Sequence, residues 1–170
     1  MLDALREYFR IDSHGEHFQS CSARGLVDQA LYGLGEELAE ARAVVEIGEL
    51  PHIWCDAAQV ERVFSALLSN SLKFRSPRCE VQVSAQPAEG ERVLFRIRDN
   101  GIGLTCRDAE RPFELFKRLV LESDYPGLGV GLSIAKRIVV RHSGKIWYER
   151  TEAPPFTSFC FTVAASRPSS

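Results

Sequence analysis

An amide and an amine lie on neighbouring turns of a helix-forming segment in the middle of the chain. Asn70 comes seven residues after Val63 and four before Phe74, so on a helix it shares a face with apolar residues. Burying an amide costs free energy unless it finds partners, and its carbonyl oxygen is a hard ligand that suits Mg²⁺. Lys73, one turn later, can reach the phosphates that such a metal ion would bind. The other interpretation is a core Asn bonded to backbone beside a solvated Lys, which the motif alone favours.

A carboxylate and two glycines follow the end of an alternating strand, in residues 99–103 (DNGIG). Asp99 can accept hydrogen bonds from an exocyclic amine such as that of adenine. The glycines allow backbone to approach a flat ring closely. The competing interpretation is a tight turn in which Asp99 caps its own backbone. This motif alone does not decide between the two.

Three glycines at alternate positions, Gly127, Gly129 and Gly131, precede a helix-forming segment. Backbone N–H groups of such a loop, together with the dipole of the helix, form a cradle for phosphate. The spacing does not fit a dinucleotide fingerprint, and the sequence contains no G-x-x-x-x-G-K-[ST] phosphate loop. A flexible loop before a helix is the weaker alternative, because all three glycines alternate.

Two aromatic side chains and a basic pair lie in residues 112–118 (PFELFKR), inside a polar stretch without sustained periodicity. The pattern predicts a lid that the aromatic residues anchor and whose Arg118 meets phosphate. A short amphipathic surface helix explains the same residues equally well. We expect residues 105–126 to be mobile without nucleotide and ordered by it.

The most regular helix expected in the chain carries Asn70 and Lys73. Asp56 can cap its first turn, with Gln59 at the capping-box position three residues later, and Pro77 is expected to stop it. The residues expected on its inward face are Val60, Val63, Phe64, Leu67, Ser71 and Phe74.

Shorter elements are expected on both sides of this helix. Residues 23–42 are expected to form one helix, although Gly33 and Gly35 weaken the pattern, and the polar residues 11–21 are expected to be a linker. The other expected elements are helices at 1–10, near 112–119 and up to His142 after the three glycines, and strands at 43–47, 52–55, 80–84, 92–98, 145–150 and 158–164. The link through Pro87 and Gly90 indicates a hairpin, and Leu94 interrupts the alternation of its second strand. This order predicts an α+β fold, a two-layer α/β sandwich with helices on one face of a mixed, largely antiparallel sheet.

Composition excludes several classes of protein. The 170 residues are 45% hydrophobic and 26% charged, as in a globular domain. The net charge of −2, without blocks of like charge, argues against nucleic-acid binding. No apolar run is long enough to span a bilayer, and the charged start is not a signal peptide, so no membrane contact is expected. The five cysteines are widely spaced without a C-x-x-C pair, which disfavours a zinc site and favours a reducing cytosol.

Four segments together resemble the N, G1, F and G2 boxes of the ATP-binding domain of sensor histidine kinases. They are LLSNSLKF (67–74), RDNGIGL (98–104), PFELFKRL (112–119) and GLGVGLSIAKRIVVRHSGKI (127–146). Their order and spacing match that domain, which has the Bergerat-type fold of the GHKL superfamily shared with DNA gyrase, the MutL proteins and a heat-shock chaperone. The resemblance runs from about Ala23 to Val163. Residues 124–127 (DYPG) and the compact flap are most similar to the phytochrome-type histidine kinases.

The resemblance implies that the matching residues bind Mg-ATP. Asn70 would ligate Mg²⁺, Lys73 would contact phosphate, and Asp99 would hold adenine. The other ATP contacts that it implies are Phe74, Gly101, Gly103, Phe116, Arg118, Gly127, Gly129, Gly131 and Leu132.

Three positions depart from the family pattern. Ala66, four residues before Asn70, stands where gyrase-type ATPases carry a Glu that activates water and where many kinases carry a second Asn. Hydrolysis like that of gyrase is therefore disfavoured, and one possible ligand for Mg²⁺ is lost. Phe156 stands where the last glycine box usually has Gly, and Ser143 replaces another Gly. Ala66 and Phe156 favour the alternative function, a degenerate non-catalytic module that binds nucleotide or serves in docking.

The family's phosphoacceptor is a His followed by an acidic residue on a long helix of a dimer. None of the four histidines fits: His14 and His17 lie in the expected linker, His52 precedes a strand, and His142 ends a helix. The acceptor is therefore expected upstream, and this chain would supply no catalytic residue of its own. The implied domains are the end of a dimerisation helix plus linker (1–22), the catalytic domain (23–164) and a disordered tail (165–170).

The sequence as a whole predicts a cytoplasmic protein histidine kinase domain of a two-component system. It would bind ATP or ADP with Mg²⁺ and present the γ-phosphoryl group to a His on the dimerisation helices of the same kinase. Catalysis would consist of positioning and charge neutralisation. The phosphoryl group would then pass to an aspartate on a response regulator receiver domain. We expect this chain alone to bind ATP but neither to label itself appreciably nor to turn ATP over quickly.

Overall fold

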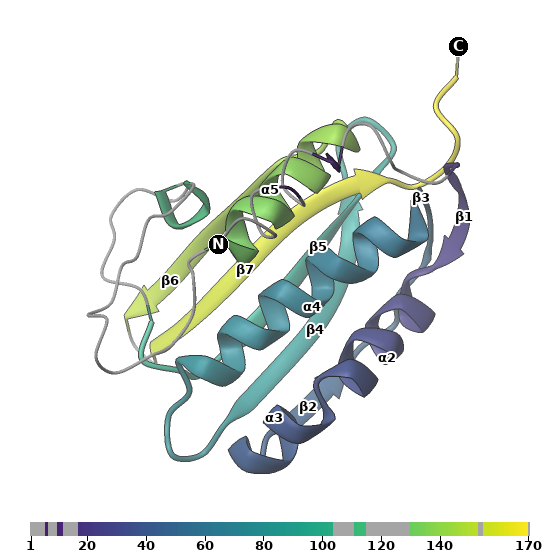
Figure 1. The fold of residues 1–170 in the computed structure, drawn as a ribbon. Coiled ribbons are helices and arrows are strands. Elements are labelled where there is room, and N and C mark those ends of the chain that lie inside the picture. The colour runs from purple at the N-terminus through teal and green to yellow at the C-terminus, as the bar shows by residue number, and fades with distance from the viewer. Residues whose placement is uncertain are drawn as a thin grey trace.

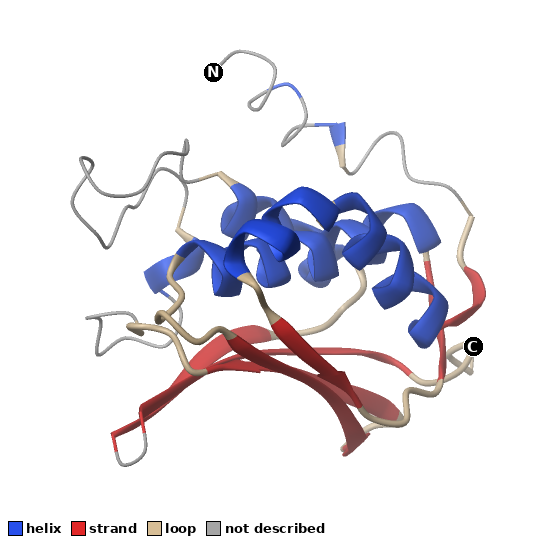
Figure 2. Ribbon diagram, turned by 90° about the horizontal axis from the view of Figure 1, so that it is seen from below, coloured by secondary structure: helices blue, strands red, loops and turns tan. Residues whose placement is uncertain are grey.

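The computed structural model describes residues 6, 10–11, 17–103, 111–114, 130–152 and 155–169. In this part of the chain, helices form one layer and a five-stranded sheet forms the other (Figure 1). Seen along the layers, no described helix covers the opposite face of the sheet (Figure 2). The predicted two-layer α/β sandwich is therefore confirmed. Among the described helices, none is long and apolar enough to cross a membrane.

The sheet has the strand order β2-β4-β5-β7-β6. Of the described strand pairs, β2–β4 is parallel and the others are antiparallel, which confirms the predicted mixed sheet. A separate antiparallel pair joins β1 to β3. The strands are β1 Gln19–Ser22, β2 Val44–Ile47, β3 His52–Cys55, β4 Glu80–Ala88, β5 Arg92–Asp99, β6 Ile146–Glu152 and β7 Pro155–Ala164.

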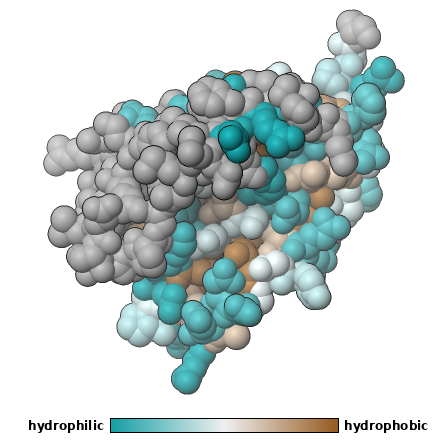
Figure 3. Space-filling view, in the orientation of Figure 1, coloured by the Kyte–Doolittle hydropathy of each residue, from teal (hydrophilic) through white to brown (hydrophobic). Residues whose placement is uncertain are grey.

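The helices that the structure describes over the sheet are α2 Ala23–Gly33, α3 Gly35–Ala41, α4 Ala57–Lys73 and α5 Gly131–Arg141. The space-filling view from this side shows hydrophobic groups in the middle of a largely hydrophilic surface (Figure 3). The core beneath α4 is aromatic. The ring of Phe64 lies 5.3 Å from the rings of both Phe95 and Phe161, and these two strand residues stack on each other at 5.2 Å. All three are fully buried, which contributes about 1.5–3 kcal/mol each.

The alternation of β5 holds through the position that had looked irregular. Val93, Phe95, Ile97 and Asp99 are buried toward the helices, and the residues between them face the other side. Leu94 is one of these outward residues and is only half-buried, so it does not break the pattern. β4 is longer than predicted, because Pro87 pairs with Val93 inside the strand. Proline is tolerated there because β2 pairs only with the beginning of β4.

Two predictions near the N-terminus are wrong. Residues 23–42 do not form one helix, because the helix ends at Gly33 and a new one begins at Gly35. Leu34 between them is buried, and two flanking glycines lower the helix propensity enough for the chain to turn there. The polar linker also ends earlier than expected, since Gln19–Ser22 is a strand that pairs with β3. The expected helix at 1–10 and most of the expected flap lie outside the described residues, apart from a 3₁₀ turn at Arg111–Phe113.

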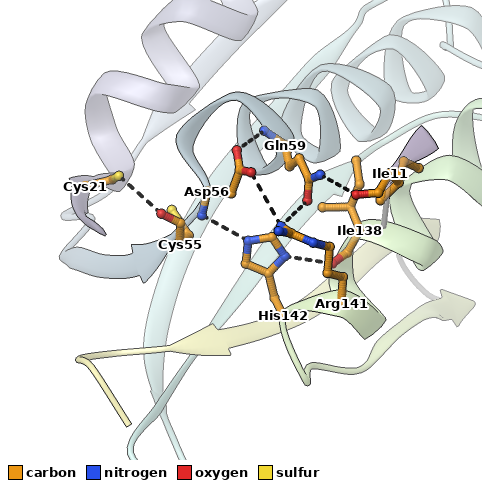
Figure 4. A network of polar contacts seen from close by, with 8 residues as sticks. All are labelled: Ile11, Cys21, Cys55, Asp56, Gln59, Ile138, Arg141 and His142. Atoms are coloured by element: carbon orange, nitrogen blue, oxygen red, sulfur yellow. Dashed lines mark hydrogen bonds and ion pairs between the residues drawn. The ribbon is translucent and has the colours of Figure 1, made fainter. Parts of the chain in front are cut away.

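Of the two hydrogen bonds predicted for the N-terminal capping box of α4, the structure contains one. The Asp56 carboxylate accepts a hydrogen bond from the Gln59 backbone N–H at 3.2 Å. The reciprocal bond of a capping box is absent among the described contacts, because the Asp56 N–H instead donates to Nε2 of His142 at 3.1 Å (Figure 4). His142 follows the last turn of α5 and lies 86 residues away in sequence. A tertiary contact has therefore replaced the local one.

The His142 ring is held as a neutral imidazole. Its Nδ1 lies 2.7 Å from the Ile138 carbonyl oxygen and donates to it, while Nε2 accepts from Asp56. The residue is 4% exposed. Burial lowers the pKa of His142, the neighbouring Arg141 cation lowers it further, and the Ile138 carbonyl and the Asp56 carboxylate oppose that shift.

The lowered pKa of His142 makes stability depend on pH. The unfolded chain binds a proton at His142 more tightly than the folded chain does, so the stability from this residue is complete above about pH 6.5 and is lost as the pH falls below it. His142→Gln keeps an acceptor for the Asp56 N–H but cannot titrate. We expect it to flatten this part of the stability profile when urea unfolding is measured between pH 5 and 8.

His142→Ala is the companion variant. It leaves the buried Asp56 N–H unpaired and should cost about 1–3 kcal/mol even at pH 8. If the wild type and His142→Gln lose stability in parallel between pH 7 and 5, the neutral imidazole is not the group responsible.

Candidate nucleotide-binding site

Asp99 is the last residue of β5 and is 4% exposed. Two groups donate to its carboxylate: the Ser71 hydroxyl of α4 to Oδ2 and the Gly101 N–H to Oδ1, each at 2.9 Å. Burial raises the pKa of Asp99, and these two hydrogen bonds act against that rise. The bond from Gly101 is the local cap of the competing interpretation. A carboxylate has further lone pairs, so the cap leaves acceptor capacity for a ligand.

The turn after Asp99 is pressed against the end of α4. The Ile102 N–H donates to the Phe74 carbonyl oxygen at 2.9 Å. A Cβ on Gly101 would lie 2.3 Å from that same oxygen, so no larger residue fits without moving α4 or the turn. Gly103 has a φ of +74°, in the left-handed region that favours glycine. The described close approach of Gly101 is thus to protein backbone, and its approach to a ligand stays a prediction.

Thr157 is a candidate that the sequence patterns did not reveal. It lies directly opposite Asp99 in the β5–β7 pairing and is 3% exposed. Its hydroxyl has no hydrogen-bond partner in the described part of the chain. A buried hydroxyl without a partner is costly, so this group is poised for a ligand or a water molecule. The sequence signal was the inward phase of β7, which was missed because that strand was expected to begin at Ser158.

Phe156, the expected departure from the last glycine box, is directed away from Asp99. The guanidinium of Arg98 lies 3.6 Å from the centre of its ring. Arg98 belongs to the outward set of β5, so the pair lies on the open face of the sheet. A depression of about 320 Å³ on that face includes both residues, together with parts of β2 and β4. The phenyl ring therefore leaves the buried side of Asp99 and Thr157 unfilled.

The last turns of α4 carry the predicted phosphate and metal residues. Asn70 is half-buried, and its side chain makes no hydrogen bond to any described residue. This does not support the interpretation of a core Asn satisfied by backbone. Lys73 is exposed on the next turn, and the half-buried Phe74 ends the helix with its N–H donated to the Asn70 carbonyl oxygen at 3.1 Å.

The N-terminus of α5 faces the middle of α4. A Cβ on Gly131 would lie 3.9 Å from that of Ala66, one turn before Asn70. The free N–H groups of the first turn of α5 therefore begin beside α4. Leu132 is partly buried and packs against the core. Four other predicted contacts, Phe116, Arg118, Gly127 and Gly129, lie outside the described residues.

The described site thus gathers around α4. Ser71 joins the helix to Asp99, Phe74 joins it to the following turn, and Ala66 lies beside Gly131. A buried acceptor with a neighbouring unpaired hydroxyl can recognise a flat heterocycle that carries an amine. A helix N-terminus beside an amide and an amine suits an anion such as phosphate. In the described part of the chain, no three His, Cys, Asp or Glu side chains gather as a metal site.

This arrangement coincides with a known family. Residues 55–167 match the family described as histidine kinase-, DNA gyrase B- and HSP90-like ATPases. The chain belongs to this family. The ATPase match includes Asn70, Asp99, Gly131 and Thr157, so the residues gathered around α4 all fall within the family's domain.

Relatives of this chain include a phytochrome and a regulatory histidine kinase. Cyanobacterial phytochrome A of Nostoc sp. is 33% identical over 164 residues, which are 96% of this chain and 21% of that protein. The methanogenesis regulatory histidine kinase FilI of Methanothrix harundinacea is 37% identical over 130 residues, which are 75% of this chain and 14% of that protein. The chain therefore spans about a fifth or less of the length of these relatives. The resemblance to phytochrome-type histidine kinases is confirmed.

A solved structure shows the same fold. The catalytic domain of histidine kinase ThkA, in a nucleotide-free form, matches with a TM-score of 0.74 at 19% identity. The match covers 88% of this chain and 97% of that one. This chain therefore shares the fold of that catalytic domain over nearly the whole length of the solved structure.

The unpaired hydroxyl of Thr157 gives a testable consequence for stability without nucleotide. Thr157→Val keeps the shape of the side chain and removes a buried polar group that has no partner. We expect the free energy of unfolding to stay unchanged or to rise by up to about 1–2 kcal/mol in urea titrations.

Thr162→Val on the same strand is the matched control, because the Thr162 hydroxyl accepts from the Lys145 N–H at 3.0 Å. That variant should lose about 0.5–1.5 kcal/mol. Equal losses in the two variants would mean that the Thr157 hydroxyl is already satisfied in the free protein.

Proposed function

We propose that this ATPase domain is the catalytic domain of a sensor histidine kinase, which presents the γ-phosphoryl group of ATP to a His outside this chain. The observation that carries the proposal is the buried pair at the end of β5 and β7. There the Asp99 carboxylate is oriented by Ser71 and Gly101, opposite the unpaired hydroxyl of Thr157.

Adenine is the group that this pair would hold. The carboxylate would accept from the exocyclic amine, and the Thr157 hydroxyl would donate to a ring nitrogen or to a bridging water molecule. Burial raises the pKa of Asp99, and the bonds from Ser71 and Gly101 oppose that rise because they stabilise the ionised form, which is the form that accepts. Phe74 and the turn through Gly101 and Gly103 would line the same pocket.

The phosphates would lie between α4 and the start of α5. Gly131 would supply a backbone N–H, Lys73 a positive charge, and the half-buried amide of Asn70 an uncharged oxygen for a metal ion. Mg²⁺ bound with the nucleotide would neutralise charge on the phosphate oxygens. Phe116, Arg118, Gly127, Gly129 and Leu132 are proposed to complete this part of the site.

Residues around the phosphates favour transfer over hydrolysis. Ala66 faces the start of α5 and supplies no carboxylate to activate water, and such a general base typically contributes about 10²–10⁴-fold. His142 is no substitute nucleophile, because it is buried and both ring nitrogens are engaged. We propose that the acceptor His lies on upstream dimerisation helices, from which the phosphoryl group passes to a response regulator receiver domain in the cytoplasm.

The alternative, a degenerate non-catalytic module, has less support. It rested on Ala66 and Phe156, and the ring of Phe156 packs with Arg98 on the open face of the sheet. The residues that would bind adenine keep their groups directed to the buried side. Ala66 argues against hydrolysis, and the amide that is missing there leaves Asn70 as the proposed amide ligand for Mg²⁺.

Nucleotide binding is the first test. Asp99→Asn replaces the acceptor with an amide that can turn its NH₂ toward adenine, and it should weaken ATP binding by roughly 1.5–3 kcal/mol, about 10–150-fold in Kd by calorimetry. Asp28→Asn, which alters an exposed ion pair with Arg24, is the matched control and should bind normally. An unchanged Kd for Asp99→Asn would remove the residue from the adenine role.

Phosphoryl transfer is the second test. With γ-labelled ATP and Mg²⁺, the chain alone should take up little label, and adding dimerisation helices with their acceptor His should restore transfer. Asn70→Ala should abolish the Mg²⁺-dependent part of ATP affinity and leave metal-free binding mostly intact. Strong acid-labile labelling of His14, His17, His52 or His142 in the chain alone would contradict the proposed place of the acceptor.

A further inference from the structure

A buried polar cluster lies at the end of α4 and α5 that is opposite to Asp99. Asp56 and Gln59 stand at the start of α4, and Arg141 and His142 at the end of α5 (Figure 4). The site around Asp99 lies at the other ends of the same helices. α4 alone is about 25 Å long, so the two sites do not touch. We name Asp56, Gln59, Arg141 and His142 the junction cluster.

The junction cluster contacts two residues that lie before β1 in the sequence, Ile11 and Phe18. The Ile11 side chain is 4% exposed, and its carbonyl oxygen accepts a hydrogen bond from Nε2 of Gln59 at 2.9 Å. The Phe18 ring stacks on the His142 ring, with centres 4.5 Å apart and planes at 18°. The guanidinium of Arg141 lies 4.9 Å from the centre of the same Phe18 ring.

Gln59 is bonded at both ends of its amide. Its Oε1 accepts from Nη1 of Arg141 at 2.8 Å, which fixes its NH₂ toward the Ile11 carbonyl. The same Nη1 lies 3.4 Å from Oδ2 of Asp56, whose side chain is fully buried. Without a carbonyl at this place, the nearly buried NH₂ of Gln59 would lose its described partner. The cluster is therefore specific for a backbone acceptor next to an aromatic ring.

We propose that the junction cluster is a docking site for the segment that enters the domain from upstream, with the Ile11 carbonyl and the Phe18 ring as the docked groups. The docked segment fixes the direction from which everything before Ile11 approaches the domain. This part of the proposal rests on the proposed function: Gln59 and Phe18 are positioning residues for phosphoryl transfer, because they hold the docked segment. They lie at the far ends of α4 and α5, so they would set where the acceptor stands and leave nucleotide affinity unchanged.

Tryptic cleavage after Arg10 reports docking without any nucleotide. The protease needs an extended chain across the Arg10–Ile11 bond, and Ile11 must leave its buried place to provide one. Gln59→Glu keeps an acceptor for Arg141 and loses the donor to Ile11. Trypsin should cut this variant after Arg10 at least about fivefold faster than it cuts the wild type, and the same is expected for Phe18→Ala. Phe18→Tyr keeps the ring and should restore the wild-type rate.

Two controls separate docking from general destabilisation. Tyr32→Ala removes an aromatic ring that is 91% exposed on α2 and should leave cleavage after Arg10 unchanged. Cleavage after Arg24, in the first turn of α2, reports opening of the domain itself. If cleavage after Arg10 and after Arg24 accelerates together, or if Gln59→Glu cleaves after Arg10 like wild type, the docking site is overturned.

The second measurement concerns transfer. In a chain that carries the acceptor helices, Gln59→Glu and Phe18→Ala should lower kcat for phosphoryl transfer several-fold, with the Kd for ATP unchanged. Unchanged kcat with faster cleavage after Arg10 would overturn the positioning role. Absence of ATP binding in the wild type would instead contradict the proposed function, and the cleavage result would still stand.

Discussion

Packing of Phe64 against Phe95 and Phe161 holds α4 on the centre of the sheet, and the other features depend on this contact. Once the helix is fixed, Ser71 reaches Asp99, Phe74 receives the turn through Gly101, and Ala66 lies against the start of α5. The first turn of the same helix meets His142. A polar site whose hydrogen-bonding atoms must be placed accurately is thus positioned by an apolar core. Protein interiors are packed densely enough to transmit such constraints.

The spacing of apolar residues along the sequence predicted most of the helices and strands. The inward face of α4 and the alternation of β4 and β5 were predictable because each has one buried and one solvent-facing side, so the residue types record the geometry. The break between α2 and α3 at Leu34 was not predictable, since a single long amphipathic stripe fits one helix or two. Pro87 was placed in the link because proline is unusual in a strand, and only the short reach of β2 along β4 makes it acceptable.

The residues of the candidate site likewise divide into those that the sequence predicted and those that it did not. Asp99, Asn70 and Gly131 belong to local motifs, so sequence spacing reveals them. Thr157 contributes only through its pairing with Asp99, a residue 58 positions earlier in the numbering, and no local pattern records that partnership. Gln59 illustrates the converse. Its position fits a capping box, yet tertiary partners outcompete the local bond, as Ile11 and Arg141 engage both ends of its amide.

The central place of β5, between β4 and β7, bears on how the domain is made. β4 and β5 form a local hairpin, whereas β7 follows α5 and β6 in the sequence and supplies Thr157, Phe159 and Phe161. During synthesis from the N-terminus, α4 and the hairpin leave the ribosome long before the strand that completes their core. Until β7 arrives, the edge of β5 and the ring of Phe64 remain uncovered by their final partner. The nascent domain is therefore most exposed to mispairing just before β7 is synthesised, and the site around Asp99 and Thr157 is among the last features to form.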